Sequence, residues 1–419
     1  MKRTLEHTIK QCMSKSEAPL VLYGPPGVGK SYLLRSFCEN EGIRSYIICD
    51  LNTDIEFRTG LMKALSDGSG LVAYLSEFFL MDESAVRNKL YLILDSVEVL
   101  YEKASVMLSG DLPYRLAVTT SRIDYLKLND SCGKNIVQNL FVPTFSFYEF
   151  LEAVSSIEGE NYAEILKTQY ESKHDLPDMI DDEVRELFHD YLLVGGYPEA
   201  IRQYIANRTD ISELYRIQEY LYSTTVLRYT KDMPEGVSYT QIMQLLSYIK
   251  KYGTENRGAF HPGHIRRGAQ LKEYQATLQY LSDNRIFTRI NVSDNLYRFE
   301  PADCGMLRYI LSDYDCFLKM DAGEELPEYI YQNYLYHVVS NQADRVEALR
   351  WGRNRYIPYI GKNCIITYRA KDIIDATNNA SDIVKGLKNR YFLNPTDKKN
   401  QPKNADHNIQ YYFLELTQF

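Results

Sequence analysis

The stretch GPPGVGKS, from Gly24 to Ser31, decides how the N-terminal part of this 419-residue chain folds. It lies between an apolar run, Ala18 to Tyr23, and an amphipathic stretch that begins at Ser31. The spacing G-x-x-x-x-G-K-S between a strand and a helix is typical of a loop whose backbone N–H groups surround phosphates. The sequence therefore predicts a site for a purine nucleoside triphosphate.

Each residue of this loop is a candidate nucleotide contact: Gly24, Pro25, Pro26, Gly27, Val28, Gly29, Lys30, Ser31 and Tyr32. The glycines allow a tight turn without a Cβ near the phosphates, and we expect the amides of Gly27 and Gly29 to face them. We expect Lys30 to reach the β- and γ-phosphates and the Ser31 hydroxyl to ligate Mg²⁺. The alternative is a loop that only turns the chain, which the lysine and serine in this context disfavour.

A second apolar run, Leu90 to Leu94, ends at Asp95. An acid at the end of a buried strand completes the Mg²⁺ shell of such a site, so Asp95 is the candidate second metal ligand. The alternative is an aspartate that ends a strand in a turn. Ser96 follows, and its hydroxyl is no general base near neutral pH. Glu98 is the candidate base, unless it is a solvated residue at the start of the next segment.

Polar residues also follow the next expected strand, at Thr119, Thr120, Ser121 and Arg122. A hydroxyl at that strand tip can sense the γ-phosphate or the attacking water, and Thr120 is the candidate sensor. Ordinary polar residues at a strand end are an equally good explanation. We expect Arg122 either to reach phosphate or to pair with the acidic helical region that follows.

The composition is that of an ordinary globular protein, with 45% hydrophobic and 25% charged residues. No apolar run approaches the ~18 residues that span a bilayer. The first residues, MKRTLEHTIKQC, lack the apolar core of a signal peptide. Seven scattered cysteines without a CxxC pair disfavour a zinc site or a disulfide framework. We therefore expect a cytoplasmic protein with no membrane partner.

Four regions differ in their patterns. Residues 1–145 alternate strands (20–23, 46–50, 90–95, 115–119) with helices (54–66 and 71–88 among them), which predicts an α/β fold with a nucleotide-binding sheet. Residues 146–235 are helical, and residues 149–199 carry fourteen acidic against three basic side chains. Residues 236–300 contain two helices and a hairpin around Ser-Asp-Asn, a winged-helix arrangement. Residues 301–419 mix helices with strands at 356–360, 363–368 and 411–416, and a polar loop covers 394–408.

The winged-helix region is a candidate DNA-binding surface, because residues 241–300 carry nine basic and five acidic side chains. Such a cluster neutralises phosphates in a salt-dependent way. Its candidate phosphate contacts are Lys250, Lys251, Arg257, Arg266, Arg267 and Lys272, with Arg289 and Arg298 on the expected wing, and Tyr252 and Tyr274 add stacking surfaces. The alternative is a packing module that lies against the acidic segment.

The order of these motifs resembles that of prokaryotic AAA-type P-loop ATPases with a winged-helix region and a C-terminal nuclease-like domain of unknown function. The matching segments, between about residues 20 and 370, are GPPGVGKS, LILDSVEVL, FVPTFSFYEFLEA, YLLVGGYPEAI, ENRGAFHPGHIRRGAQLKEYQATLQYLSDNRIFTRI and YRFEPADCGMLRYIL. The resemblance implies an AAA-type parallel sheet that binds ATP and Mg²⁺, a helical and winged-helix region, and an α+β restriction-endonuclease-like domain at 301–419. It also implies self-assembly or a protein partner.

The chain departs from that family at the positions of its catalytic acids. Gln332, Tyr356, Pro358, Thr367 and Arg369 stand where the resemblance implies the metal-binding acids and lysine of a nuclease. Ser96 likewise replaces the glutamate that usually follows the strand-end aspartate. We therefore expect an Mg-ATP-binding protein with weak hydrolysis, which couples nucleotide state to the winged-helix module and to an inactive nuclease-like module. The alternatives are a non-hydrolysing, nucleotide-gated scaffold for DNA or a protein and, least favoured, an active nuclease.

Overall fold

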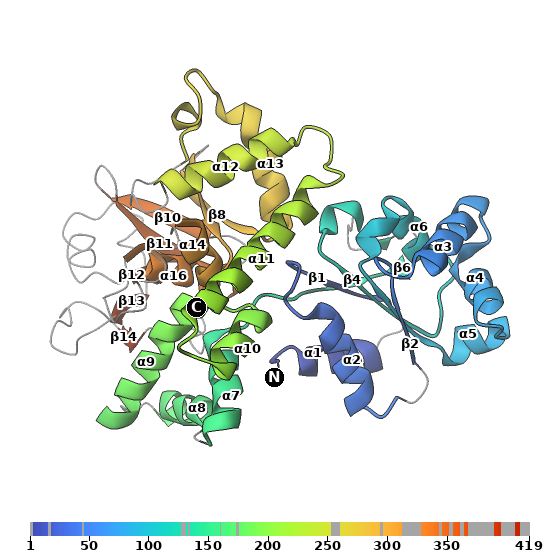
Figure 1. Ribbon diagram of the computed structural model, residues 1–419, viewed down its shortest axis with the longest axis horizontal. Coiled ribbons are helices and arrows are strands. Elements are labelled where there is room, and N and C mark those ends of the chain that lie inside the picture. The colour runs from blue at the N-terminus through green and yellow to red at the C-terminus, as the bar shows by residue number, and fades with distance from the viewer. Residues whose placement is uncertain are drawn as a thin grey trace.

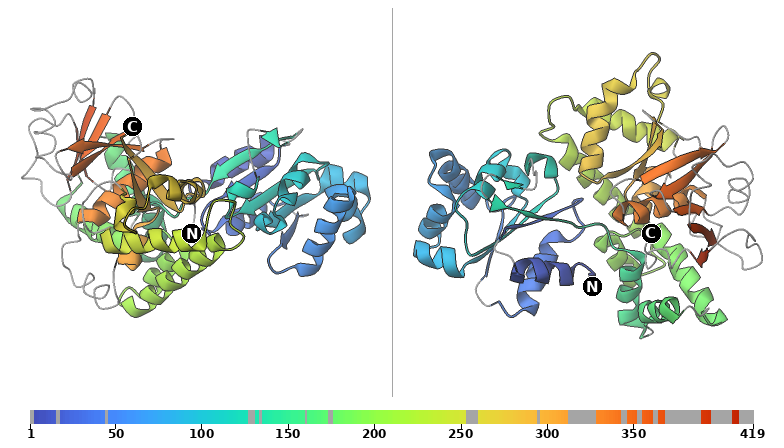
Figure 2. Two further views of the ribbon diagram at one scale, coloured as in Figure 1. Left: turned by 90° about the horizontal axis from the view of Figure 1, so that it is seen from above. Right: turned by 180° about the vertical axis from the view of Figure 1, so that it is seen from behind.

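The computed structural model describes residues 3–15, 18–43, 46–126, 131–132, 135–159, 161–172, 176–252, 260–293, 296–311, 328–342, 346–351, 355–360, 364–367, 389–394 and 407–410. The N-terminal sheet with its helices forms one body, and the later elements form a second body beside it (Figure 1). Both further views show the same division (Figure 2). None of the helices in the described ranges is long and apolar enough to cross a membrane.

The first body contains a five-stranded parallel sheet in the order β2-β3-β4-β1-β7. Its strands are β1 (Leu20–Tyr23), β2 (Tyr46–Asp50), β3 (Tyr91–Asp95), β4 (Arg115–Thr120) and β7 (Gln138–Phe141). The first four confirm the strands predicted from the apolar runs. The sheet is apolar on both faces, as expected for parallel strands covered on both sides. Leu20 and Leu22 lie in one core, and Val21 between them lies in the other.

Helices cover both faces of this sheet. They are α1 (Glu6–Lys15), α2 (Lys30–Asn40), α3 (Ile55–Asp67), α4 (Gly70–Phe78), α5 (Glu83–Lys89) and α6 (Lys103–Ser109), and a small hairpin of β5 (Ser131–Cys132) and β6 (Asn135–Ile136) precedes β7. The single helix predicted over 71–88 is wrong, because the chain breaks between α4 and α5. Leu80 has a φ of 53° there, and the Asp82 side chain caps α5 by accepting from the Ser84 N–H.

The region after β7 is helical, as predicted. It comprises α7 (Phe147–Glu158), α8 (Tyr162–Ser172), α9 (Asp178–Val194), α10 (Pro198–Ala206) and the long α11 (Ile211–Thr230). A capping box starts α7: the Glu149 N–H donates to the Ser146 hydroxyl, and the Ser146 N–H donates to the Glu149 carboxylate. α11 extends toward the first body (Figure 1).

The two helices and the hairpin predicted for 236–300 are confirmed as α12 (Tyr239–Tyr252), α13 (Leu271–Asp283), β8 (Phe287–Ser293) and β9 (Leu296–Pro301). They are followed by α14 (Cys304–Leu311), α16 (Glu328–Gln342), β10 (Val346–Trp351), β11 (Arg355–Ile360), β12 (Cys364–Thr367), β13 (Asn389–Asn394) and β14 (His407–Gln410). β11 and β12 match two of the strands predicted beyond residue 301. The strand predicted at 411–416 and residues 395–406 of the polar loop lie outside the described residues.

One sheet of seven strands joins the hairpin to the strands that follow it, in the order β14-β13-β12-β11-β10-β8-β9. β8 pairs with β9 in antiparallel and with β10 in parallel fashion. The sheet therefore continues across residue 300, where the sequence pattern suggests a division between two regions. α12 and α13 lie at one end of the second body and α8 and α9 at the other (Figure 1).

Candidate nucleotide site

The loop between β1 and α2 has the backbone that its glycines allow. Gly27 and Gly29 have φ angles of 82° and 89°, and α2 begins directly after Gly29. At Gly24 a Cβ would lie 2.3 Å from the Val142 carbonyl oxygen, so only glycine fits against the end of β7. The Gly24 N–H donates to the Thr120 carbonyl at 3.3 Å, which ties the loop to the tip of β4.

Lys30, the first residue of α2, is buried beneath the loop with 7% of its surface exposed. Its Nζ donates to the carbonyl oxygens of Gly24 and Pro25 at 2.9 and 2.8 Å. Burial lowers the pKa of Lys30 to about 8, and the nearby carboxylates of Glu98 and Asp95 oppose that shift. The ammonium therefore lies next to the loop and to both of the acids predicted for the site.

Asp95, at the end of β3, is where the predicted metal ligands meet. The Ser31 hydroxyl donates to Asp95 Oδ2 at 2.6 Å. The Thr119 hydroxyl donates to Asp95 Oδ1, and the Ser96 N–H donates to the Thr119 hydroxyl at 3.1 Å. Mg²⁺ prefers oxygen ligands and is usually held by one or two carboxylates with substrate phosphates. The hydroxyl and carboxylate of this pair fit that preference.

Glu98 lies in the short 3-10 helix η1 (Val97–Leu100), directly after Ser96, whose φ of 63° is left-handed. Its side chain is 4% exposed, so the interpretation of Glu98 as a solvated residue is wrong. The Arg228 Nη1 of α11 lies 3.2 Å from Glu98 Oε1. The candidate base is therefore held in an ion pair with a helix of the second body.

Thr120, the predicted sensor, faces away from Asp95. Its hydroxyl donates to the Arg122 carbonyl at 3.0 Å and accepts from the Arg122 N–H at 2.9 Å. Successive side chains of a strand point to opposite faces, so Thr119, one residue earlier, is the hydroxyl that reaches Asp95. The sequence placed both residues at the strand tip without distinguishing their faces.

Arg122 bonds to the helical region through backbone carbonyls, where the sequence suggested a pairing with its acidic side chains. Its guanidinium donates to the carbonyls of Lys231 and Asp232 at 2.6 and 3.1 Å and pairs with Asp124 at 2.8 Å. The Tyr229 hydroxyl donates to the Ser121 carbonyl at 2.6 Å nearby. These contacts hold the chain where it leaves α11, at the C-cap Lys231 and at the residue after it. The tip of β4 is thereby bonded to α11.

Three contacts of the loop were not predicted from the sequence. Tyr197 and Pro198, at the start of α10, lie against the loop: each has a ring carbon within 3.7 to 3.9 Å of the place where a Cβ of Gly27 or Gly29 would stand. The GGYP segment was visible in the sequence, but its contact with the loop was not. Arg3 donates to the Val28 carbonyl at 3.3 Å, and a single arginine near the N-terminus carries no such signal.

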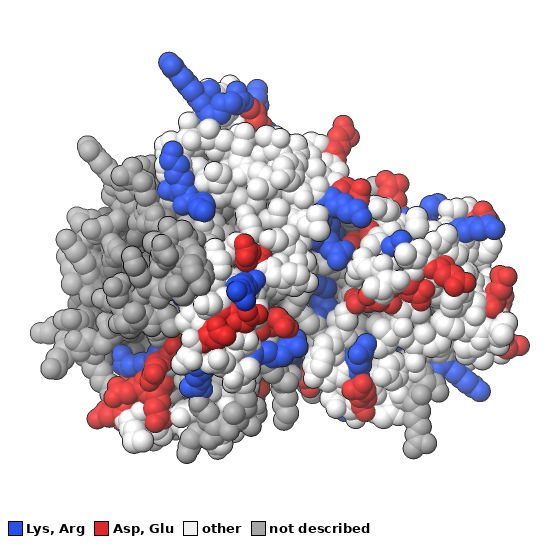
Figure 3. Space-filling view, viewed as in Figure 1, with Lys and Arg blue, Asp and Glu red and all other residues white. Residues whose placement is uncertain are grey.

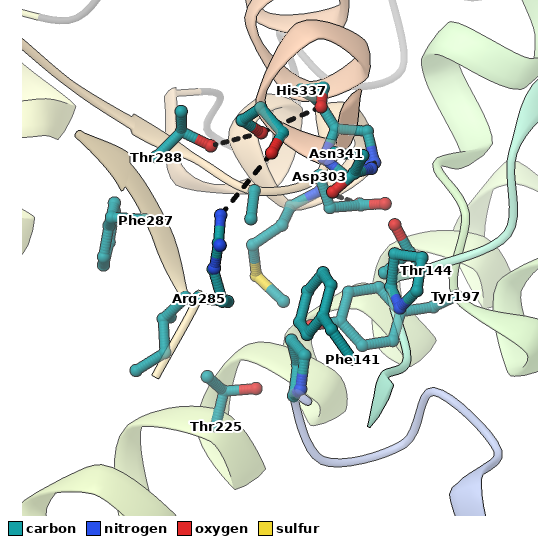
Figure 4. Close-up of a pocket in the computed structure, with 16 residues that line it drawn as sticks. Phe141, Thr144, Tyr197, Thr225, Arg285, Phe287, Thr288, Asp303, His337 and Asn341 are labelled. Atoms are coloured by element: carbon teal, nitrogen blue, oxygen red, sulfur yellow. Dashed lines mark hydrogen bonds between the residues drawn. The ribbon is translucent and has the colours of Figure 1, made fainter. Parts of the chain in front are cut away.

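A small cavity, which Pro25 helps to line, lies between the two bodies (Figure 4). Its walls include Arg285, Asp303 and His337, and its volume of about 30 Å³ admits about one water molecule. The Asp303 carboxylate accepts from the Gly196 and Met306 N–H groups at 2.7 and 2.9 Å. Burial lowers the pKa of His337 to about 4. The cavity is too small for a nucleotide.

The basic residues predicted for DNA divide into two groups. Lys250, Lys251, Arg266, Arg267 and Lys272 are exposed, and basic side chains gather at the end of the molecule where α12 and α13 lie (Figure 3). Arg298, in contrast, is buried in an ion pair with Glu300. Tyr274 is also buried, so its predicted stacking role is wrong, whereas the Tyr252 ring stacks on His264 at 4.8 Å. Arg289 donates to Gln279 at 2.9 Å, and Arg257 lies outside the described residues.

Of the expected nuclease positions, Gln332 is buried in α16 and donates to the Tyr336 hydroxyl at 3.3 Å. Tyr356, Pro358 and Thr367 fall on β11 and β12, and Arg369 lies outside the described residues. Within the described ranges, no group of three or more His, Cys, Asp or Glu side chains is placed to hold a metal.

The strand order and the loop geometry together define the first body as a P-loop NTPase α/β fold. No protein-family model and no curated protein matches the chain. Among solved structures it is similar to a Walker-type ATPase of Pyrococcus abyssi, with 16% identity and a TM-score of 0.44 over 74% of this chain and 95% of that one. It is also similar to the RuvB Holliday junction branch migration motor of Thermotoga maritima, with 14% identity and a TM-score of 0.32 over 69% of this chain and 89% of that one. A STAND protein of Pyrococcus horikoshii is similar with 13% identity and a TM-score of 0.31, over 82% of this chain and 46% of that one.

Proposed function

We propose that this protein is an AAA-type nucleotide-binding protein that binds Mg-ATP at Gly24–Ser31 and hydrolyses it slowly. The observation that carries the proposal is the 2.6 Å hydrogen bond between Ser31 and Asp95, beside the buried ammonium of Lys30. The glycine-rich loop ends in a lysine and a hydroxyl, and the neighbouring parallel strand ends in a carboxylate. This set of groups is suited to bind a phosphate chain with its metal ion.

In this proposal the loop amides of Gly27 and Gly29 bind the phosphates, and Lys30 exchanges its loop carbonyls for phosphate oxygens. Ser31 and Asp95 would hold Mg²⁺, which neutralises developing charge on the phosphates. Thr119 fixes the Asp95 carboxylate by donating to its second oxygen. We assign the sensor role to Thr119 in place of Thr120 on the basis of that contact.

Glu98 is the proposed base, and its ion pair with Arg228 supports slow turnover, because a carboxylate engaged with a cation is less available to bond to an attacking water. Arg228 belongs to α11, and Arg122 also bonds to the end of that helix. We therefore propose that nucleotide state reaches the helices α12 and α13 and the C-terminal sheet through α11, with the sheet acting as an inactive nuclease-like module.

Turnover separates this proposal from the rival, a scaffold that binds nucleotide without hydrolysis. We expect phosphate release from Mg-ATP by the wild type, loss of release in Lys30→Ala, and no change in the control Lys63→Ala, which alters an exposed lysine of α3. A wild type that binds Mg-ATP but releases no phosphate would favour the scaffold. A wild type that does not bind nucleotide would reject both.

Substitution of Glu98 tests the base. General base catalysis contributes roughly 10²- to 10⁴-fold, so Glu98→Gln is expected to lower the rate at least tenfold while Mg-ADP affinity stays unchanged. An unchanged rate would remove Glu98 from the mechanism. Lower affinity as well would indicate that the substitution disturbs the loop.

DNA is a second candidate ligand, favoured by the five exposed basic residues around α12 and α13. Phosphate neutralisation predicts that affinity for a fluorescent duplex falls steeply with salt concentration. Charge reversal of Lys250 and Lys251 together should weaken binding and reduce that salt dependence, while reversal of Lys63 should not. Salt-independent binding would contradict the assignment. Degradation of a plasmid by the Lys30→Ala variant would contradict the inactive nuclease-like module.

A further inference from the structure

Arg3 reaches the phosphate-binding loop from a segment that precedes it in the chain. Its Nη1 donates to the Val28 carbonyl at 3.3 Å, and its Nη2 donates to the Pro143 carbonyl at 2.8 Å. Its Nε pairs with Glu149 Oε1 at 3.1 Å, and both side chains are 2% exposed. The guanidinium carbon lies 4.2 Å from the centroid of the Phe145 ring. A planar guanidinium bonded on three sides and stacked on a ring has one orientation.

The Glu149 carboxylate that anchors Arg3 is itself fully hydrogen-bonded. Its Oε1 also accepts from the N–H and the hydroxyl of Thr4 at 2.7 and 2.9 Å. Its Oε2 accepts from the Ser146 N–H at 3.1 Å in the first turn of α7. Burial lowers the Arg3 pKa and Glu149 opposes the shift, and an arginine stays charged in proteins. The Arg3 guanidinium that donates to the Val28 carbonyl is therefore anchored to α7 through Glu149.

The contact with the Val28 carbonyl determines where the next amide points. A trans peptide group is planar, so the Val28 C=O and the Gly29 N–H point in opposite directions. Arg3 bonds to that oxygen, and the Gly29 N–H therefore points away from Arg3. Among the residues that the structure describes, no hydrogen-bond acceptor for this N–H is found.

We propose that Arg3 is a positioning residue that directs the Gly29 N–H at the phosphates of the bound nucleotide. The proposal rests on the proposed function of the loop Gly24–Ser31 and names a residue that the loop motif does not contain. A lysine at position 3 keeps the positive charge opposite Glu149. It has no planar guanidinium, however, and so cannot bond to Glu149, Val28 and Pro143 in the fixed geometry of Arg3. The Arg3→Lys variant therefore separates the direction of the amide from the ion pair.

The first experiment measures binding of Mg-ADP and of inorganic tripolyphosphate by calorimetry. Hydrogen bonds to charged groups are strong, so loss of one well-directed amide is expected to weaken both ligands about tenfold or more in Arg3→Lys. Arg35→Lys is the matched control, because Arg35 is exposed on α2, and it should bind as the wild type does. Thermal unfolding of each variant shows that the compared proteins are folded.

The second experiment observes the Gly29 amide itself. The dipeptide Val-Gly occurs twice in the chain, at Val28–Gly29 and Val194–Gly195. Labelling valine with ¹³C at its carbonyl and glycine with ¹⁵N therefore leaves two amide signals in a carbonyl-filtered spectrum, and a Val194→Ile variant assigns them. Tripolyphosphate should shift the Gly29 signal strongly in the wild type and weakly in Arg3→Lys, while the Gly195 signal serves as the internal control.

The outcomes distinguish this proposal from the proposed function. A wild type that binds neither Mg-ADP nor tripolyphosphate overturns the proposed function and this proposal with it. A wild type that binds both, with equal affinity and an equal Gly29 shift in folded Arg3→Lys, overturns only the role of Arg3. If Arg3→Lys does not fold, the double variant Arg3→Gln with Glu149→Gln takes its place, because it removes the guanidinium without leaving a buried charge unpaired and is expected to lose the same response. An unshifted Gly29 signal in a wild type that binds tripolyphosphate also overturns the role of Arg3.

Discussion

The charge of Lys30 depends on its burial, which lowers the pKa of its ammonium group. Its pKa of about 8 means that part of the nucleotide-free protein loses the ammonium charge above neutral pH. Phosphates near the side chain favour the charged form, so binding of Mg-ADP should take up a proton. We expect uptake to rise from near zero at about pH 7 to near one proton at about pH 9, and affinity to fall over the same interval. Calorimetry in buffers of different ionisation enthalpy measures this uptake.

The Lys30→Arg variant is the control for that measurement, because a guanidinium keeps its proton over the whole interval. Its proton uptake should not change with pH, even if its affinity is lower. Equal uptake by the wild type at pH 7 and at pH 9 would contradict the lowered pKa of Lys30.

Much of the site could be predicted at the scale of single residues. Ser31 and Asp95 follow from local patterns, a loop motif and an apolar run with an acid at its end. Arg3 and Arg228 do not, because their partners lie far away in the sequence and their contacts exist only after the chain has folded. The sequence did not show that Thr119, and not Thr120, contacts Asp95, since the alternation of β4 could not be anchored to a known face.

At the scale of elements, α11 is bonded to the segments that follow β3 and β4. Arg228 faces Glu98 after β3, and Arg122 after β4 bonds to the end of the helix. Removing Arg228 leaves the buried Glu98 carboxylate without its ion-pair partner. Because Arg228 is 28% exposed, we expect Arg228→Met to lower the free energy of unfolding by about 1 to 3 kcal/mol, less than for a fully buried pair.

A double-mutant cycle measures how much of that loss belongs to the pair. In urea unfolding, Arg228→Met with Glu98→Gln should cost about 1 kcal/mol less than the sum of the single variants. Arg216 and Glu213 offer a matched pair on the same helix with 74% and 41% exposure, and their cycle should give close to zero. Additive losses at Arg228 and Glu98 would show that the helix is not coupled to η1 through this contact.

Element boundaries followed the sequence where apolar periodicity was strong, as in α12 and the first four strands. β7 was missed because its four residues, Gln138 to Phe141, begin with two polar side chains. The break between α4 and α5 was missed because no glycine or proline marks it. Asp82 makes it instead, by capping a new helix.

At the scale of the whole molecule, the junction between the two bodies should be sensitive to acid. Burial lowers the pKa of His337 from 6.5 to about 4, so between these values the unfolded chain takes up a proton that the folded protein excludes. Stability is therefore lost as the pH falls from about 6.5 toward 4, by up to about 3 kcal/mol. Asp303 on the same cavity acts in the opposite direction, because burial raises its pKa.

Thermal unfolding at a series of pH values tests this. His337→Gln should reduce the loss of stability between about pH 7 and pH 5. His264→Gln alters an exposed histidine of the same body and should leave the loss unchanged. An identical pH profile for wild type and His337→Gln would show that other groups cause the acid sensitivity.

The hairpin of β8 and β9 has a mechanical consequence. A hairpin with a free edge can move without its neighbours. β8 is instead hydrogen-bonded on both edges and belongs to the seven-stranded sheet. Asn284, between α13 and β8, accepts from the Ile123 N–H just beyond β4 at 3.0 Å. We therefore expect a rotation of α13 about that contact to turn the seven-stranded sheet with it.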